Sequence, residues 1–143
     1  MMNLDDLPTP ALIVDLDKLE ANISSMAGRA RQLGVSLRPH VKAHKCIQIG
    51  KLQVKAGAGG ITAATLYEAE VFADAEFDDI TWASPLILSR IPQAQVLAQR
   101  VELGVVVDSM HAAQALAVTK HPFKTWIKVD CGYGRSGIDP AAD

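Results

Sequence analysis

Short apolar runs alternate with amphipathic segments along nearly the whole chain. The apolar runs predict buried strands over 11–14, 35–41, 59–64, 80–83, 104–107 and 125–129. The segments between them repeat apolar residues every three or four positions, which predicts helices over 16–33, 45–55, 66–75, 89–100 and 110–118. Strands and helices are therefore expected to alternate from one end of the chain to the other.

Polar residues at the predicted helix starts support these boundaries. Asp15 or Asp17 is a candidate N-cap of the first helix, and the Asp-Ser pair at 108–109 is placed to cap the last. Thr65 and Glu68 stand three residues apart before an apolar segment, which is the spacing of a capping box.

The regular alternation predicts an α/β fold. The expected strand ends follow one another at steps of about 22 residues, so one βα unit repeats without a large insertion. Such repeats build a parallel sheet with right-handed crossovers. Two architectures fit: a doubly wound open sheet, or a parallel (β/α) barrel of the TIM type with only about five of its eight units present. No glycine-rich dinucleotide fingerprint follows the first strand, which removes the usual support for the open sheet.

The chain stops shortly after the last predicted strand and its loop. A domain rarely ends at that point of a βα repeat. We therefore expect a fragment, or a truncated form, of a longer protein.

Composition excludes several classes of function. Apolar residues make up 49% of the chain and the net charge is −2, so no global field attracts nucleic acid or an anionic membrane. No apolar run is long enough to span a bilayer. Cys46 and Cys131 lack metal-ligand spacing, and we expect both to be small packing residues in a cytoplasmic protein.

Polar residues follow nearly every predicted strand. In both architectures ligands bind at the carboxyl ends of the strands, so these residues form the candidate site. They are His40, Lys42, His44, Thr62, Thr65, Ser84, Asp108, Ser109, Asp130, Tyr133 and Arg135. The set suits an anionic ligand.

The segment Arg38-Pro39-His40-Val41-Lys42-Ala43-His44-Lys45-Cys46 concentrates cations at the end of a predicted strand. A lysine amine there can form a Schiff base with an aldehyde once burial or neighbouring cations lower its pKa. The alternative for any such lysine is a solvated residue at the rim. Lys45 fits that alternative at the start of a helix, and Lys42 is closer to the strand end. His40 and Lys42 are expected on one side of an extended segment, because strand side chains alternate.

The other candidates have structural interpretations beside the functional one. Arg135 follows a loop with three glycines, which either approaches a ligand or makes a surface turn. His44 is expected to be a hydrogen-bonded structural residue, and Asp130 a cap or turn residue. Trp82 and Trp126 are expected to pack in the interior.

Four segments resemble a known family. The segment 38–46 resembles the lysine motif of the D-threonine aldolase and D-serine dehydratase group, which are fold-type III pyridoxal phosphate enzymes related to the N-terminal barrel domain of alanine racemase. Segments 9–17, 65–70 and 129–137 resemble the opening strand, the second-helix motif and the fifth-strand loop of that group. The likeness covers nearly the whole chain.

The resemblance implies a fold and a set of site residues. Residues 1–16 would form an N-terminal strand belonging to a second β-domain, and residues 17–143 the N-terminal part of a (β/α)8 barrel. Lys42 would carry pyridoxal phosphate as a Schiff base, and Arg135 would reach the phenolic oxygen of the cofactor. His40 and Thr62 complete the expected cofactor contacts.

The resemblance also implies an activity. We expect cleavage of D-3-hydroxy amino acids, such as D-threonine, to glycine and an aldehyde. Alternatives are a D-serine dehydratase, an amino-acid racemase, or a non-catalytic pyridoxal phosphate-binding protein. The family implies a divalent metal, but its ligands and the phosphate-binding loops cannot be assigned to residues of this chain. Open sheet edges would favour assembly, and we expect a homo-oligomer.

Overall fold

The computed structural model describes residues 3–141. Residues 1–2 of the predicted segment 1–16 and residues 142–143 of the predicted barrel part 17–143 lie outside the described residues. Its centre is a parallel sheet in the order β1-β2-β3-β4. The strands are β1 (Ile61–Ala63), β2 (Asp79–Pro85), β3 (Glu102–Val107) and β4 (Lys124–Ile127). The helices are α1 (Leu16–Gln32), α2 (Ile47–Lys55), α3 (Leu66–Asp74), α4 (Ile91–Leu97) and α5 (Met110–Val118), with 3₁₀ turns η1 (Leu4–Asp6), η2 (Val41–Ala43) and η3 (Leu88–Arg90).

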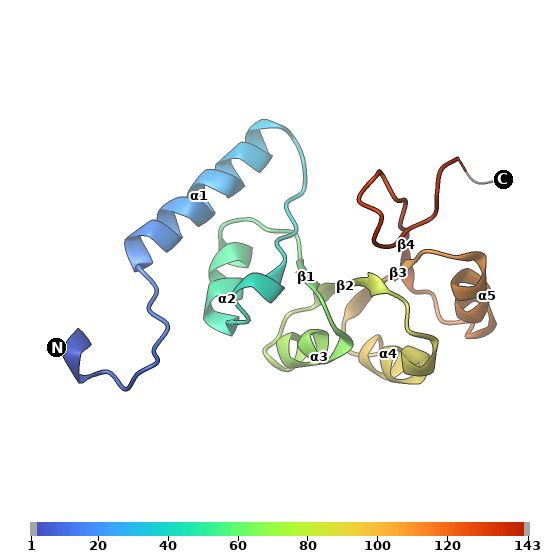
Figure 1. The fold of residues 1–143 in the computed structure, drawn as a ribbon, viewed down its shortest axis with the longest axis horizontal. Coiled ribbons are helices and arrows are strands. Elements are labelled where there is room, and N and C mark those ends of the chain that lie inside the picture. The colour runs from blue at the N-terminus through green and yellow to red at the C-terminus, as the bar shows by residue number, and fades with distance from the viewer. Residues whose placement is uncertain (1–2, 142–143) are drawn as a thin grey trace.

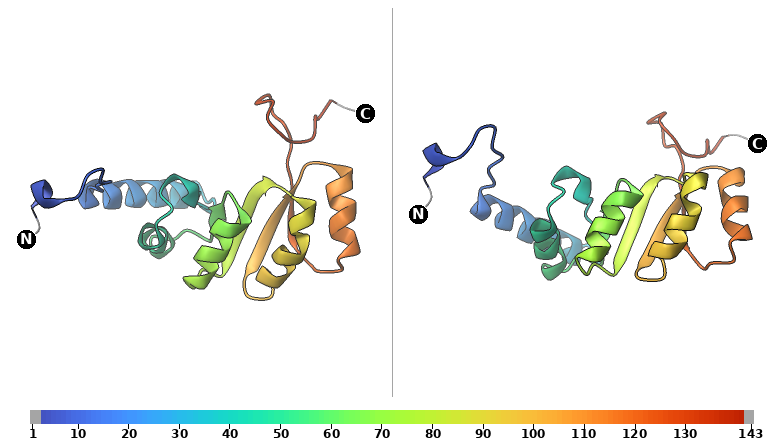
Figure 2. Two further views of the ribbon diagram at one scale, coloured as in Figure 1. Left: turned by 60° about the horizontal axis from the view of Figure 1, so that its bottom comes forward. Right: turned by 90° about the horizontal axis from the view of Figure 1, so that it is seen from below.

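Helices α3, α4 and α5 lie side by side along one face of the sheet (Figures 1 and 2). Sequential strands are neighbours in the sheet, and each helix connects one strand to the next. A doubly wound sheet would place helices on both faces. Among the described residues the helices α3–α5 share one face, so the expected partial barrel is confirmed and the open sheet is excluded.

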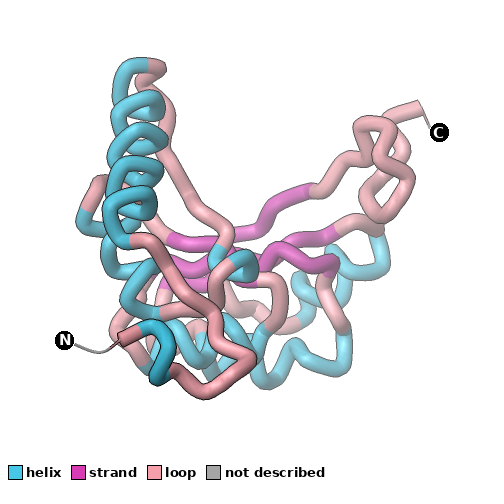
Figure 3. Tube along the Cα trace, turned by 60° about the vertical axis from the view of Figure 1, so that its left-hand side comes forward, coloured by secondary structure: helices cyan, strands magenta, loops and turns pink. Residues whose placement is uncertain are grey.

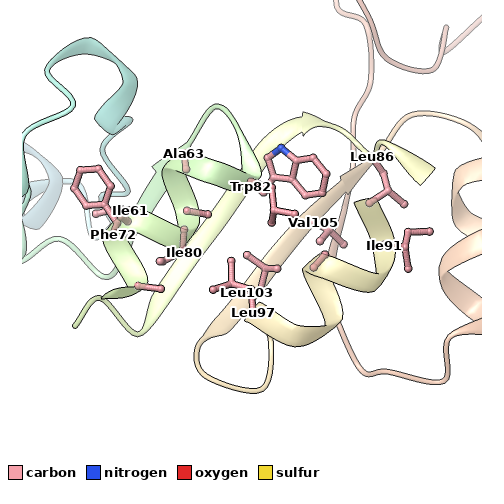
Figure 4. Close-up of a cluster of buried hydrophobic side chains, with 14 of the residues drawn as sticks. Ile61, Ala63, Phe72, Ile80, Trp82, Leu86, Ile91, Leu97, Leu103 and Val105 are labelled. Carbon is pink, nitrogen blue, oxygen red and sulfur yellow. The ribbon is translucent and has the colours of Figure 1, made fainter. Parts of the chain in front are cut away.

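The core lies between the sheet and these helices. Alternate residues of the strands point into it, and Trp82 is its largest fully buried side chain at 1% exposure. Figure 4 shows Trp82 among aliphatic side chains of the sheet and of α4, including Leu97, Leu103 and Val105. The apolar alternation of the sequence therefore builds the helix-covered face.

The opposite face of the sheet is open. Figure 3 shows α1 and the C-terminal loop rising on either side of the sheet, so the chain forms a curved trough. Gly104 and Trp126 lie on this face: a side chain at Gly104 would lie 3.2 Å from the Trp126 indole nitrogen. Trp126 is 47% exposed, so the prediction that its ring packs in the interior is wrong.

Two predicted strands are not strands in the structure. Residues 11–14 are extended but unpaired, and Leu12 is 93% exposed. The run 35–41 makes only one bridge, between His40 and Thr62, before the chain turns into η2. An apolar run becomes a strand only when a neighbouring backbone pairs with it, and within the described residues neither run has that pairing along its length.

Helix boundaries differ by a few residues. The helix expected to begin at residue 45 begins at Ile47, after Cys46 as an N-cap without a side-chain hydrogen bond. The helix expected over 89–100 is the turn η3 followed by α4, which ends at Leu97. The helix 110–118 is confirmed at both ends, and Ser109 caps it. Cys131 is exposed, so its predicted packing role is wrong, whereas Cys46 is half-buried.

Candidate functional site

The turn η2 presents Lys42 at the carboxyl end of the first barrel segment. The Thr62 N–H donates to the Pro39 carbonyl at 2.8 Å, which holds this segment against β1. Val41 is fully buried, and its carbonyl accepts from the Lys45 N–H at 2.8 Å. Because Val41 points inward, the next residue of the turn, Lys42, is exposed. The amine is therefore accessible to a ligand from solvent.

His40 lies directly beside this lysine. The Lys42 backbone N–H lies 3.4 Å from His40 Nδ1, which accepts from it as the N-cap of η2. Burial lowers the pKa of His40 below its ordinary 6.5, the charge of Lys42 lowers it further, and Glu68 and the backbone of Thr62 oppose the shift. The imidazole is thus held neutral next to the amine.

The prediction that His40 and Lys42 lie on one side of an extended segment is wrong in its premise, because the segment is not extended there. Residues 41–43 form a 3₁₀ turn, and side-chain directions in such a turn do not alternate as in a strand. The two residues are neighbours nevertheless, because the cap hydrogen bond joins them.

Glu68 connects the lysine turn to α3. Its Oε1 lies 3.3 Å from Lys45 Nζ, and its Oε2 accepts from the Ala64 N–H at 2.8 Å. Burial raises the pKa of Glu68, but the Ala64 hydrogen bond and Lys45 outweigh burial and lower it overall. Lys45 remains 68% exposed, which agrees with the predicted rim position.

The Thr65 cap of the predicted capping box is confirmed. Thr65 Oγ1 accepts from the Glu68 N–H at 3.0 Å, and the Glu68 carboxylate accepts from the Ala64 N–H at 2.8 Å. A hydrogen bond from the Thr65 backbone also helps to lower the pKa of that carboxyl. Sequence reasoning assigned Glu68 only to the cap and missed its ion pair with Lys45. The helical spacing carries no signal for that pair, since Lys45 lies on a different element.

Thr62 belongs to the same group of residues. It is half-buried in the middle of β1, between Ile61 and Ala63, which enter the helix-covered core. Alternation therefore turns Thr62 to the open face, where its bridge partner is His40. The structure thus brings His40, Lys42 and Thr62 together.

The loop after β4 carries Arg135. Asp130 Oδ1 accepts from the N–H groups of Gly132 at 2.9 Å and Gly134 at 3.0 Å, and these bonds lower the pKa of Asp130. The loop closes where Ile138 exchanges backbone hydrogen bonds with Lys128 and Asp130. Asp130 is the turn residue that the sequence predicted.

Arg135 is exposed, with its guanidinium 5.2 Å from the centre of the Tyr133 ring. The loop follows β4, at the opposite edge of the sheet from β1 and His40. Arg135 therefore does not join the Lys42 group in this structure. The two segments stand on either side of the open face (Figure 3).

His44 has a structural role, as predicted. Its Nδ1 accepts from the Cys46 N–H at 3.0 Å, and its Nε2 lies 3.3 Å from the Gln53 side-chain oxygen. These contacts join η2 to α2. Thr65 and Ser109 are occupied as helix caps.

The Lys42 group fits a cofactor with an aldehyde. It offers an accessible primary amine, an imidazole held neutral by its surroundings and a threonine hydroxyl on the open face. Within residues 3–141 no group of three or more His, Cys, Asp or Glu side chains could hold a metal ion. In that same range no helix has the length and apolar character to cross a membrane.

Comparison with known proteins identifies relatives with the same fold. Residues 14–143 match the model of the alanine racemase N-terminal domain. The chain is 43% identical over 137 residues to D-threo-3-hydroxyaspartate dehydratase of Delftia sp. strain HT23, covering 92% of the chain and 36% of that protein. It is 33% identical to D-serine dehydratase of Dictyostelium discoideum, covering 96% of the chain and 38% of that protein. The crystal structure of D-threonine aldolase from Filomicrobium marinum aligns with a TM-score of 0.89 and 33% identity, over 96% of the chain and 38% of that structure.

The chain thus spans little more than a third of the length of the relatives it matches. The family model nevertheless covers nearly all of it, from the residue before the α1 cap to the end. The partial barrel and the sequence match agree, and the chain belongs to the alanine racemase N-terminal domain family, in the fold-type III pyridoxal phosphate group that its lysine motif resembles.

Proposed function

We propose that the chain contributes the lysine and part of the cofactor site of a pyridoxal phosphate-dependent lyase acting on D-3-hydroxy amino acids. The observation that carries the proposal is Lys42, accessible on the turn η2 beside a His40 of lowered pKa. The relatives support it, because the names of the dehydratase and the aldolase described above specify D-configured amino acids as their substrates.

Each site residue has a distinct role in this proposal. Lys42 would hold the cofactor through its amine and would be the group placed to move a proton at the substrate α-carbon. His40, uncharged beside it, limits the positive charge near the amine and contacts the cofactor with Thr62. Arg135, on the loop after β4 at the opposite edge of the sheet, would have to reach across the open face to contact the phenolic oxygen of a cofactor held by Lys42. Bound pyridoxal phosphate supplies the electron sink for bond cleavage at that carbon.

The bond that is cleaved distinguishes two candidate reactions. The resemblance of segment 38–46 led us to expect an aldolase, and the likeness to D-threonine aldolase supports that candidate. The 43% identity to D-threo-3-hydroxyaspartate dehydratase favours loss of water from the same substrate class. Both reactions use a lysine at this position and a hydroxyl on the β-carbon.

Covalent trapping tests the lysine assignment. The chain is incubated with pyridoxal phosphate, reduced with borohydride, digested and mapped by mass spectrometry. We expect the adduct on Lys42, its loss in Lys42→Ala, and its retention in the matched variant Lys45→Ala. An adduct that persists in Lys42→Ala, or folded protein that takes up no cofactor, would refute the proposal.

Product analysis separates the reactions. D-threonine, D-serine and D-3-hydroxyaspartate are supplied with and without a divalent metal, and products are measured. Glycine with an aldehyde indicates the aldolase, whereas a 2-oxo acid with ammonia indicates the dehydratase. Racemised substrate would indicate the racemase alternative, and cofactor binding with no product would favour the non-catalytic binding protein.

We also propose the arrangement of the larger protein. Residues 1–16 join a second β-domain, and the metal ligands come from outside this chain. Within that segment, residues 8–15 are exposed and lie outside any helix or strand. The exposed apolar side chains of residues 12–14 support assembly as a homo-oligomer, and we propose the cytoplasm as its location. Light scattering of the purified protein checks the oligomer.

A further inference from the structure

The lysine turn presents two primary amines to solvent. Lys42 and Lys45 are three residues apart, and both are exposed. Exposure alone therefore does not determine which of the two amines would react with the aldehyde of pyridoxal phosphate. The difference between them lies in their contacts with the neighbouring element α3.

Lys45 leaves the turn η2 in an unusual backbone conformation and reaches α3. Its φ is +49°, in the left-handed region that residues other than glycine rarely adopt. Its N–H donates to the Val41 carbonyl at 2.8 Å, which supports this conformation. The Lys45 ammonium lies 3.3 Å from Oε1 of Glu68, in the first turn of α3. Lys42, by contrast, takes part in none of the ion pairs formed within residues 3–141.

The Glu68 carboxylate is fixed in place independently of Lys45. Its side chain is only 12% exposed, and its Oε2 accepts from the Ala64 N–H at 2.8 Å, just after β1. Burial raises the pKa of Glu68, but bonds from the Ala64 backbone, from Lys45 and from the Thr65 backbone outweigh burial and lower it below 4.5. The end of β1 thus carries a fixed negative charge that binds one of the two lysines.

This ion pair affects the reaction with an aldehyde. The amine nitrogen adds to the carbonyl carbon, a C=N bond forms, and the carbonyl oxygen leaves as water. An ammonium has no lone pair for that addition, so reaction at Lys45 requires its ion pair with Glu68 to break first. We propose that Glu68 is a positioning residue that binds Lys45 and thereby reserves the cofactor aldehyde for Lys42. This role rests on the proposed function, since it determines the selectivity of the same Schiff-base reaction.

The distribution of the adduct between the two lysines measures this selectivity. The wild-type chain and Glu68→Gln are incubated with pyridoxal phosphate and reduced with borohydride, and the adducts on Lys42 and Lys45 are quantified by mass spectrometry. The glutamine keeps an oxygen for the Ala64 N–H and loses the charge. We expect the Lys45 share to rise about threefold to fivefold, which is the range for a partly exposed ion pair. Glu70→Gln is the matched control on α3, because Glu70 forms no ion pair with Lys45.

Two further measurements separate this role from an effect on folding. About 1 M sodium chloride screens an exposed pair, so it should raise the Lys45 share in the wild-type chain without any substitution. In the chain without cofactor, Glu68→Gln should lower the pKa of His40, because the Glu68 charge raises that pKa against burial and Lys42. NMR titration of His40 measures this change, and Glu70→Gln should leave it absent.

The outcomes distinguish this role from the proposed function. An unchanged Lys45 share in Glu68→Gln, a loss of the Lys42 adduct without a gain at Lys45, or an unchanged His40 pKa would each overturn the role of Glu68 and leave Lys42 as the cofactor lysine. Folded wild-type chain with no adduct on either lysine would refute the proposed function and this role together.

Discussion

His40 and Lys42 illustrate how neighbouring residues set each other's protonation. Burial is the largest cause of the lowered His40 pKa, and the Lys42 charge is the second. Since the folded protein binds a proton at His40 less readily than the unfolded chain does, protonation favours unfolding. This contribution destabilises the fold as pH falls through the ordinary histidine value of 6.5.

Lys42→Met is therefore expected to raise the pKa of His40 without restoring it fully, because burial remains. NMR titration of the His40 ring protons measures the change. Lys45→Met is the matched control, since Lys45 is not among the causes of the shift. An unchanged His40 pKa in Lys42→Met would show that the two charges do not interact.

The same pKa predicts a pH dependence of stability. The free energy of unfolding should fall as pH drops from about 7.5 to about 5.5, and His40→Asn should reduce that slope. Chemical denaturation at each pH measures the slope. A slope that is unchanged in His40→Asn would assign it to other groups.

At the scale of elements, Arg38 attaches the first barrel segment to the sheet. Its guanidinium bonds to the Asp79 carboxylate, with Nη1 2.7 Å from Oδ1, beneath the backbone of Gly60. Gly60 has φ +150°, and a Cβ there would collide with Arg38 and Asp79. The Arg38–Asp79 contact therefore helps to hold residues 35–41 against the sheet, although they form only one strand bridge with it.

Gly60→Ala should destabilise the fold by about 1–3 kcal/mol, from backbone strain and the displaced ion pair. Denaturant unfolding measures the loss. Gly34→Ala is the control for the conformational part alone, because Gly34 also has positive φ but open space around it. Equal losses at both positions would exclude a role for the Arg38–Asp79 contact.

Helix α5 depends on its cap. Ser109 Oγ accepts from the Ala112 N–H at 3.2 Å. Ser109→Ala should reduce the free energy of unfolding by about 1 kcal/mol. Ser89→Ala, at an exposed serine in η3, is the control, and a similar loss in both variants would argue against the cap.

At the scale of the whole molecule, burial is uneven. Strands β2 and β3 lie inside the sheet and carry most of the core, whereas residues 8–14 make no backbone hydrogen bonds within the described chain. Figure 2 shows the N-terminal segment extending away from the sheet layer. Local opening free energies follow such differences in packing.

Hydrogen exchange should show this gradient. Amides of 80–82 and 103–107 are expected to exchange slowest, and those of 11–14 at nearly the rate of an unfolded peptide. Mass spectrometry of peptide fragments measures both regions in one sample. Strong protection of 11–14 would indicate that this segment pairs with another strand in solution, as a second copy would provide.

Sequence analysis predicted the larger part of the fold and the centre of the site. The period of apolar residues identified the five α-helices and the four strands that the described residues form, because amphipathic burial is a local property of the chain. The lysine motif led to the prediction of Lys42 as the site lysine, and the structure places His40 beside it. Thr62 was placed at the same strand end by topology alone.

The errors share one physical cause. Strand formation at 11–14 and 35–41 requires a partner backbone, and burial of Trp126 requires an element packed on the open face of the sheet, where Trp126 is 47% exposed. The Glu68–Lys45 ion pair also joins residues that are distant in sequence. Strand pairing, the burial of Trp126 and this ion pair all depend on contacts between distant segments, so the local pattern of apolar and polar residues does not predict them.

By itself, the sequence determined the alternation of strands and helices and the helix caps, because these follow from local periodicity and local hydrogen bonds. A contiguous motif also led to the prediction of Lys42 as the cofactor lysine. Only the tertiary structure decided that Lys42 lies on a 3₁₀ turn and that Arg135 stands at the opposite edge of the sheet. These features depend on which backbones pair across the sheet and on which side chains they bring together.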